Sequence, residues 1–200
     1  MKNLQDLEKI VNSELTTKIN NSKIKHDQLY INIDENDLKD VIFFLKTNKE
    51  TKFKQLIEIT AVDYPQKDRR FKLVYLMLSH ENNKRILIDC YVKENDLVSS
   101  ITEIFPSSNW MEREVFDMYG IEFKNHPDLR RILTDYNFKG FPLRKDFPLT
   151  GFNEVRYSEK DKKVIYEPVK LEQNYRDFDF SSPWEGTKYL EEIKSKNKND

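Results

Sequence analysis

Residues 71–92, which read FKLVYLMLSHENNKRILIDCYV, hold the clearest strand pattern in the 200-residue chain. The stretch 71–78 is apolar on both alternating faces, which is typical of a strand at the centre of a sheet. Residues 86–92 place an apolar side chain at every second position, Cys90 among them. The intervening segment 81–83, Glu-Asn-Asn, favours a turn. This stretch therefore predicts two consecutive strands on which the rest of the fold is built.

Toward the N-terminus, the spacing of apolar residues alternates between the periods of helices and strands. A helical period over 3–20 predicts an amphipathic helix. A period of two over 29–33 predicts a strand whose partner starts at Ile24, and 34–45 predicts a second helix with Asp34 as its cap. Residues 57–61 alternate again. The resulting α-β-β-α-β-β-β order predicts an α+β fold: a two-layer domain with helices on one face of a largely antiparallel or mixed sheet.

Toward the C-terminus, the chain changes character near Gly120. Residues 97–105 are interpreted as a short helix, and a further helix is predicted from Asn109 to Gly120. All four glycines and five of the seven prolines lie at or after Gly120. We therefore expect a compact domain over 1–120 and an extended, mostly irregular segment over 121–200. The aromatic residues of this segment must be buried either on its own domain or on a partner that it wraps.

Composition and charge exclude several classes of protein. Lys and Arg number 34 against 35 Asp and Glu, which gives a net charge of −1 and argues against a nucleic-acid binder. Apolar runs are far shorter than the ~20 residues of a membrane-spanning helix. The single cysteine permits neither an intrachain disulfide nor a cysteine-ligated cluster. Its place on an apolar strand predicts an inert core residue.

The densest group of ionisable residues lies in the helix predicted over 109–120. Glu114 and Asp117 are three residues apart and form a candidate carboxylate pair for acid–base chemistry or a divalent metal, with His126 as a further ligand. The alternative function is thus a small metal-dependent hydrolase that uses these three residues. Spacing alone favours the simpler interpretation, in which the charges cap the helix and pair with arginines such as Arg113.

Four motifs then occur in a fixed order: 112–120 EREVFDMYG, 126–133 HPDLRRIL, 140–148 GFPLRKDFP and 166–168 YEP. In this order they closely resemble the 30-kDa subunit family of respiratory complex I, the proton-pumping NADH:quinone oxidoreductase, in which the bacterial member is designated C. The resemblance extends over roughly residues 24–186. It implies an α+β domain followed by an extended C-terminal part.

The resemblance also implies a function. Members of this family are peripheral-arm subunits without catalytic residues or cofactors of their own. Electrons pass from NADH through FMN and iron–sulfur clusters in partner subunits to quinone, coupled to proton translocation. The implied partners are the 49-kDa (D) subunit and the iron–sulfur subunits B and I. The implied location is the inner membrane, held there only through the complex, on the cytoplasmic side in a bacterium or the matrix side in a mitochondrion.

The signature motifs carry over onto twelve residues of this chain. We assign them to structure and to the partner interface rather than to catalysis, with Arg144 or Lys145 expected to meet carboxylates of a partner. The twelve are Glu112, Arg113, Glu114, Asp117, His126, Pro127, Asp128, Arg130, Arg131, Arg144, Lys145 and Asp146.

Overall fold

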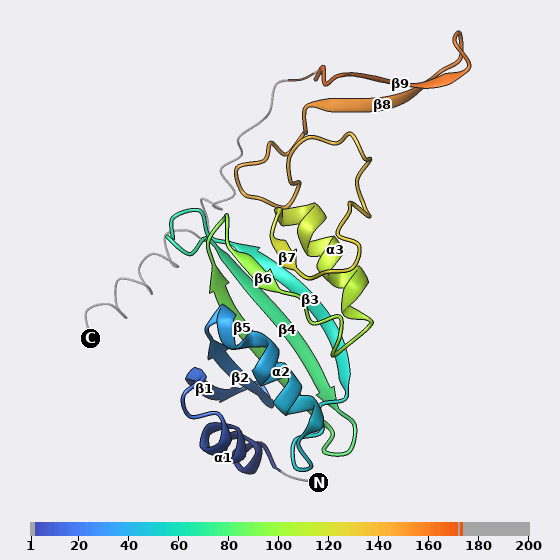
Figure 1. The fold of residues 1–200 in the computed structure, drawn as a ribbon. Helices are drawn as coiled ribbons and strands as arrows, with labels where there is room; N and C mark the ends of the chain where they lie inside the picture. The colour runs from blue at the N-terminus through green and yellow to red at the C-terminus, as the bar shows by residue number, and fades with distance from the viewer. Residues whose placement is uncertain (1–2, 172, 174–200) are drawn as a thin grey trace, which may run out of the picture. The chain divides into compact units, whose positions relative to one another are not determined.

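The structure is a computed structural model that describes residues 3–171 and 173. Its element order begins α-β-β-α-β-β-β, as predicted (Figure 1). The elements are α1 (Leu4–Glu14), β1 (Ile19–Lys25), β2 (Gln28–Ile33), the 3-10 turn η1 (Glu35–Asp37), α2 (Leu38–Thr47), β3 (Gln55–Asp63), β4 (Phe71–Ser79), β5 (Lys84–Val92), β6 (Leu97–Ser99), α3 (Ser108–Tyr119), β7 (Glu122–Lys124), β8 (Asn153–Ser158) and β9 (Lys163–Pro168).

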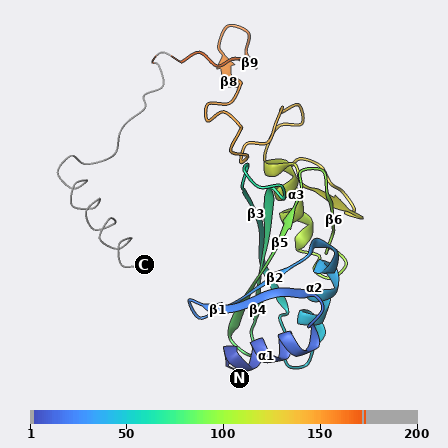
Figure 2. The same ribbon diagram turned by 90° about the vertical axis from the view of Figure 1, so that its left-hand side faces the viewer.

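Five strands form one mixed sheet in the order β1-β2-β5-β4-β3. Only the β2–β5 pairing is parallel, and the other pairings are antiparallel. Figure 2 shows α1, α2 and α3 on the same side of this sheet. Alternate residues of β4 and β5 are buried beneath that helical layer. The predicted two-layer α+β architecture is therefore confirmed, and residues 71–92 supply its two central antiparallel strands.

Four local expectations are corrected. The second helix starts at Leu38 after η1, and Asp34 does not cap it. The first helix ends at Glu14, because residues 19–25 pair with β2 instead of continuing the helix. Residues 97–99 form the short strand β6, which pairs in parallel with β7, rather than a helix. The helix α3 starts at Ser108, and Asn109 is not its cap. Its end at Gly120 is as predicted, with a left-handed φ of 75°.

The chain divides into two compact units between Gly151 and Phe152. The first unit extends beyond Gly120 because the following loop folds back onto α3, where the Leu143 amide donates to the Met118 carbonyl oxygen at 3.1 Å. In the second unit, β8 and β9 form an antiparallel hairpin that the sequence pattern did not predict. Of the segment 121–200 that the sequence predicts to be extended and to wrap a partner, residues 172 and 174–200 lie outside the described residues.

Candidate functional site: a helix with a loop held by buried charges

The carboxylate of Asp117, on α3, binds the long loop of residues 125–152, which follows α3 and β7. Its Oδ2 atom accepts hydrogen bonds from the backbone amides of Ile132, Leu133 and Thr134 at 3.0, 2.7 and 2.8 Å. Its Oδ1 atom accepts from the Arg131 guanidinium at 2.7 Å and from the Thr134 hydroxyl at 2.5 Å. The side chain is fully buried. One ionised carboxylate therefore satisfies five donors, and this closes the loop onto the helix.

These hydrogen bonds determine the protonation state of Asp117. Burial alone would raise the pKa of its carboxyl group, but the bonds from Thr134 and Arg131 outweigh burial and lower that pKa to about 2. Because the folded pKa lies below the unfolded value, Asp117 stabilises the fold above about pH 4. That stabilisation is lost as the pH falls toward 2.

This difference in pKa makes a prediction for unfolding in urea. The stability advantage of the wild type over Asp117→Asn is expected to shrink by roughly 1 kcal/mol between about pH 6 and pH 3. Denaturation curves of the two proteins at both pH values provide the measurement, and the amide variant serves as the control for all other titrating groups. An advantage that stayed constant or grew in acid would contradict the assignment.

Two arginines complete this attachment. Arg131 also donates to the Gly140 carbonyl oxygen at 3.0 Å, and its guanidinium lies over the rings of Phe138 and Phe141. Arg113 donates to the carbonyl oxygens of residues 130 and 131 at 3.0 and 3.1 Å. The possible Arg113–Asp117 pair therefore does not form. Arg131 takes its place from a position 14 residues along the chain.

A second group of charges holds the end of the same loop to the sheet. Arg70 forms a bidentate pair with buried Asp63 at 2.7 and 2.8 Å and an ion pair with Asp146 at 2.9 Å. These bonds lower the pKa of the Asp63 carboxyl group. Asp63 also accepts the backbone amide of Lys145 at 2.8 Å. Sequence reasoning missed Asp63 and Arg70, because no local motif marks two residues that meet the loop about 80 positions further on.

Arg144 belongs to this second group as well. It donates to the Tyr119 carbonyl oxygen at 2.6 Å, pairs with Glu94 and lies over the ring of Phe141. Its side chain is 12% exposed. Within the chain, Arg144 is therefore paired with Glu94, and its expected contact with a carboxylate of a partner stays a prediction.

The side chains of Glu112 and His126 lie side by side and are fully buried. Glu112 accepts the backbone amide of Ile101 at 2.8 Å, while its other oxygen lies 3.9 Å from His126 Nε2. His126 is held by the Asn109 carbonyl oxygen and the Asp128 amide, both at 3.1 Å. Burial raises the pKa of the Glu112 carboxyl group. Both side chains therefore join α3 to the preceding and following loops.

The geometry does not support the metal-dependent alternative. Glu114 is exposed, Asp117 is buried and occupied by five donors, and His126 is held by backbone groups. Within residues 3–171 and 173, no group of three or more His, Cys, Asp or Glu is placed to bind a metal ion. Cys90 is buried, as predicted, and burial raises its thiol pKa to about 12. The thiol is therefore not a nucleophile at neutral pH.

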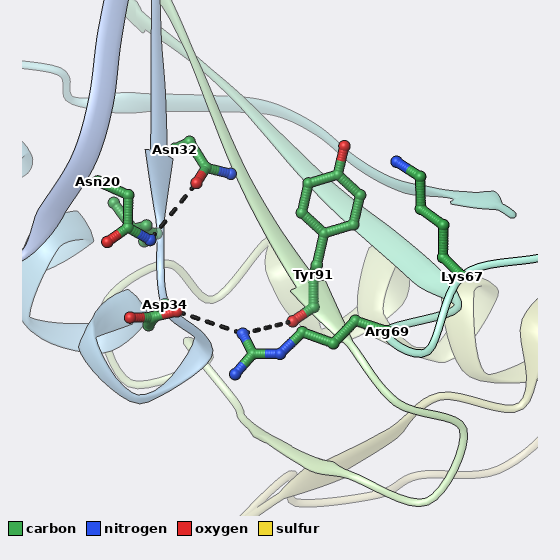
Figure 3. Close-up of a pocket in the computed structure, with 7 residues that line it drawn as sticks. Asn20, Asn32, Asp34, Lys67, Arg69 and Tyr91 are labelled. Carbon is green, nitrogen blue, oxygen red and sulfur yellow. Dashed lines mark hydrogen bonds and ion pairs between the residues drawn. The ribbon is translucent and has the colours of Figure 1, made fainter.

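A hollow of about 360 Å³ lies at one end of the sheet, lined by Asn32, Asp34, Arg69 and Tyr91 among others (Figure 3). Arg69 is already engaged there by Asp34 and Glu35, each at 3.2 Å. The hollow therefore offers no unpaired guanidinium for an anionic substrate.

The fold and the attached loop define a class of protein: an α+β unit in which charged residues such as Asp117, Arg131 and Arg144 hold a long loop to the domain. Sequence comparison identifies the family. Residues 31–153 match the family described as "Respiratory-chain NADH dehydrogenase, 30 Kd subunit", and the chain belongs to it.

Close relatives are named as the C subunit of NADH-quinone oxidoreductase. The protein of Dinoroseobacter shibae is 53% identical over 94% of this chain and 87% of its own length. Those of Ruegeria pomeroyi and Parvibaculum lavamentivorans are 55% and 57% identical over 82% and 75% of each chain. The relatives are thus named as subunits of an oxidoreductase.

A solved structure shares the fold. It is titled as the membrane-bound sulfane sulfur reductase, an archaeal respiratory membrane complex, and one of its chains matches with a TM-score of 0.62. The match covers 72% of this chain and 85% of that one at 23% identity, so the likeness is of fold alone. Among the described helices, none is long and apolar enough to cross a membrane.

Proposed function

We propose that this chain is a non-catalytic subunit of the peripheral arm of an NADH:quinone oxidoreductase. In this proposal, partner subunits carry FMN and the iron–sulfur clusters that pass electrons from NADH to quinone, coupled to proton translocation. The chain contacts the 49-kDa (D) subunit and the iron–sulfur subunits B and I. It associates with the inner membrane only through them, on the cytoplasmic side in a bacterium or the matrix side in a mitochondrion.

The observation that carries this proposal is the hairpin β8–β9. Its register places Val155 opposite Tyr166 and Tyr157 opposite Val164, so these four side chains share one face. Each is more than half exposed. An isolated two-stranded hairpin is marginally stable in water, and an exposed apolar face adds to the cost of leaving it uncovered. Burial of this face against a partner subunit accounts for both features.

The site supports the same role. Three of the signature residues, Asp117, Arg131 and Arg144, are engaged in holding the loop and are not gathered around a cleft. The same part of the chain exposes large apolar side chains instead: Trp110 is 64% exposed, Leu133 61% and Tyr136 78%. Tryptophan and tyrosine are enriched at protein interfaces. This division favours a scaffold over an enzyme site.

Co-purification tests the proposal. Tagged full-length chain recovered from gently solubilised membranes is expected to bring with it a large assembly that contains flavin, iron–sulfur clusters and NADH:quinone reductase activity. The double variant Val155→Glu, Val164→Glu places two charges on the hairpin face. We expect it to reduce the recovered assembly at least tenfold, because two charges must then be desolvated on binding.

The matched control adds the same charge at exposed positions outside the hairpin. Gln5→Glu, Thr17→Glu is expected to leave recovery unchanged. If the wild-type chain were recovered alone, without flavin or iron–sulfur signals, the proposed function would be wrong. Normal recovery with the hairpin variant would remove the hairpin from the interface.

A further inference from the structure

The central strand β4 is apolar on both faces, yet the described residues cover only one of them. Phe71, Leu73 and Tyr75 are buried under the helices, whereas Val74 and Leu76 lie half-buried on the opposite face. When one face of a sheet is exposed to solvent, the residues at alternate positions of its strands are normally polar. A continuous apolar run is typical of strands buried on both sides. The second face therefore carries the pattern of a covered surface.

Strand register extends this apolar centre across the sheet. Leu76 lies opposite Leu87 of β5, which in turn lies opposite Tyr30 of β2. The pair Lys72–Asp89 lies beside this row, with Nζ and Oδ2 2.7 Å apart and both side chains largely shielded. This ion pair is already satisfied within the chain, so covering it costs less than covering an unpaired charge. Asn32 of β2 and Tyr91 of β5, both labelled in Figure 3, alternate in step with Tyr30 and Leu87 and so belong to the same open face.

The rim of this open face is basic. Lys23 and Lys25 on β1 and Arg85 on β5 are exposed on it, and no ion pair joins any of them to another of the described residues. Among the acidic residues that the structure describes on the face, Asp89 is paired with Lys72, and Glu58 of β3 lies directly opposite Leu76 as its one exposed carboxylate near the centre. The face thus carries a local positive excess in a chain whose net charge is −1.

We propose that this open sheet face, centred on Leu76 and Leu87, docks another protein chain of the same assembly through an apolar surface with an acidic rim. The inference rests on the proposed function. Charge complementarity selects the occupant: carboxylates on the partner would meet Lys23, Lys25 and Arg85. A second copy related by two-fold symmetry would bring these cations against one another, so it is disfavoured. The apolar side chains of this face are half-buried rather than fully exposed, so the face is better suited to pack against another protein than to insert into lipid.

Site-specific photo-cross-linking tests this proposal in the assembled complex. Tyr30 in the full-length tagged chain is replaced by p-benzoylphenylalanine, a larger aromatic residue at a half-buried position, and the complex is irradiated before solubilisation. The expected product links Tyr30 to a different polypeptide, at a peptide rich in Asp and Glu. The positional control places the same probe at Lys9, an exposed residue of α1 on the helical side of the sheet. This probe is not expected to give the product.

Charge reversal supplies the second measurement. Lys23→Glu, Arg85→Glu is expected to lower the yield of the Tyr30 product at least tenfold, while the control Lys9→Glu, Lys49→Glu, with the same change in net charge, leaves it unchanged. Neither pair of substitutions removes an ion pair described in the structure, although Lys23 lies over the ring of Tyr30. Equal thermal unfolding of the two purified variants is the check that loss of folding does not explain a difference between them.

The outcomes separate this inference from the proposed function. A link to residues 174–192 of the same chain, to a second copy or to lipid would overturn it. Absence of any link while flavin and iron–sulfur subunits still co-purify would also overturn it, and the proposed function would stand. Recovery of the chain without any assembly would refute both.

Discussion

Replacing Asp117 with alanine is expected to destabilise the first unit by roughly 3–5 kcal/mol, because it breaks a buried ion pair and leaves the other partner without its countercharge. Arg131 loses its carboxylate, and three consecutive backbone amides lose their acceptor. Domains of this size are stable by only about 5–15 kcal/mol, so the loss is a large part of the total. Urea denaturation of the purified chain measures it.

The matched control lies one turn away on the same helix. Glu114 is exposed, so Glu114→Ala is expected to change the free energy of unfolding by no more than about 0.5 kcal/mol. The contrast between the two carboxylates tests which of them holds the loop. Equal effects at both positions, or a small effect at Asp117, would show that the loop is held mainly by its other contacts.

Replacing Gly120 with alanine is expected to cost about 2–5 kcal/mol. Gly120 has a left-handed φ of 75°, where an L side chain adds about 1–2 kcal/mol of backbone strain. An added Cβ would also lie 2.6 Å from the Phe141 ring and 2.7 Å from Arg144 Nη2. Overpacking of this kind costs about 1–3 kcal/mol more. Besides urea denaturation, faster hydrogen exchange at the Leu143 amide, which bonds to Met118, would show that the loop has loosened.

Gly151 provides the control for the backbone strain of an alanine at positive φ. Its φ is 69°, but no heavy atom lies within 4 Å of an added Cβ. Gly151→Ala is therefore expected to cost about 1–2 kcal/mol through backbone strain alone, with no change in exchange at Leu143. If both alanine variants lowered the free energy of unfolding equally, the close contact of the added Cβ at position 120 with Phe141 and Arg144 would contribute nothing to the destabilisation.

The fold was predictable where a repeating local pattern decides it. The period-two runs of β4 and β5 and the helical period of α2 each report a face buried along a single element. Boundaries were less predictable: Ile19 fits the helical period of α1, yet it belongs to β1 because pairing with β2 satisfies its backbone. Residues 97–99 were mistaken for a helix because a three-residue strand is too short to show a period.

The hairpin β8–β9 was missed for a different reason. Val155 and Tyr157, and then Val164 and Tyr166, do alternate, but the runs are short and stand in a stretch of charged residues. These four side chains are each more than half exposed, so they do not belong to a buried face of the kind that identified the other strands. Alternation without burial remains a signal for such segments, and here it coincides with the surface that we propose binds a partner.

The order of the core elements, their α+β class and the family could all be read from the amino-acid sequence, because each depends on local periodicity or on motifs in a fixed order. The role of the signature charges became visible only in the folded chain. Asp117 is joined to Arg131 and not to Arg113, and Asp63 meets the amide of Lys145 from 82 residues away. Such pairings depend on which distant segments the fold brings back to α3, and the spacing of residues within one helix does not predict this. The burial that makes them strong is likewise a property of the assembled layers.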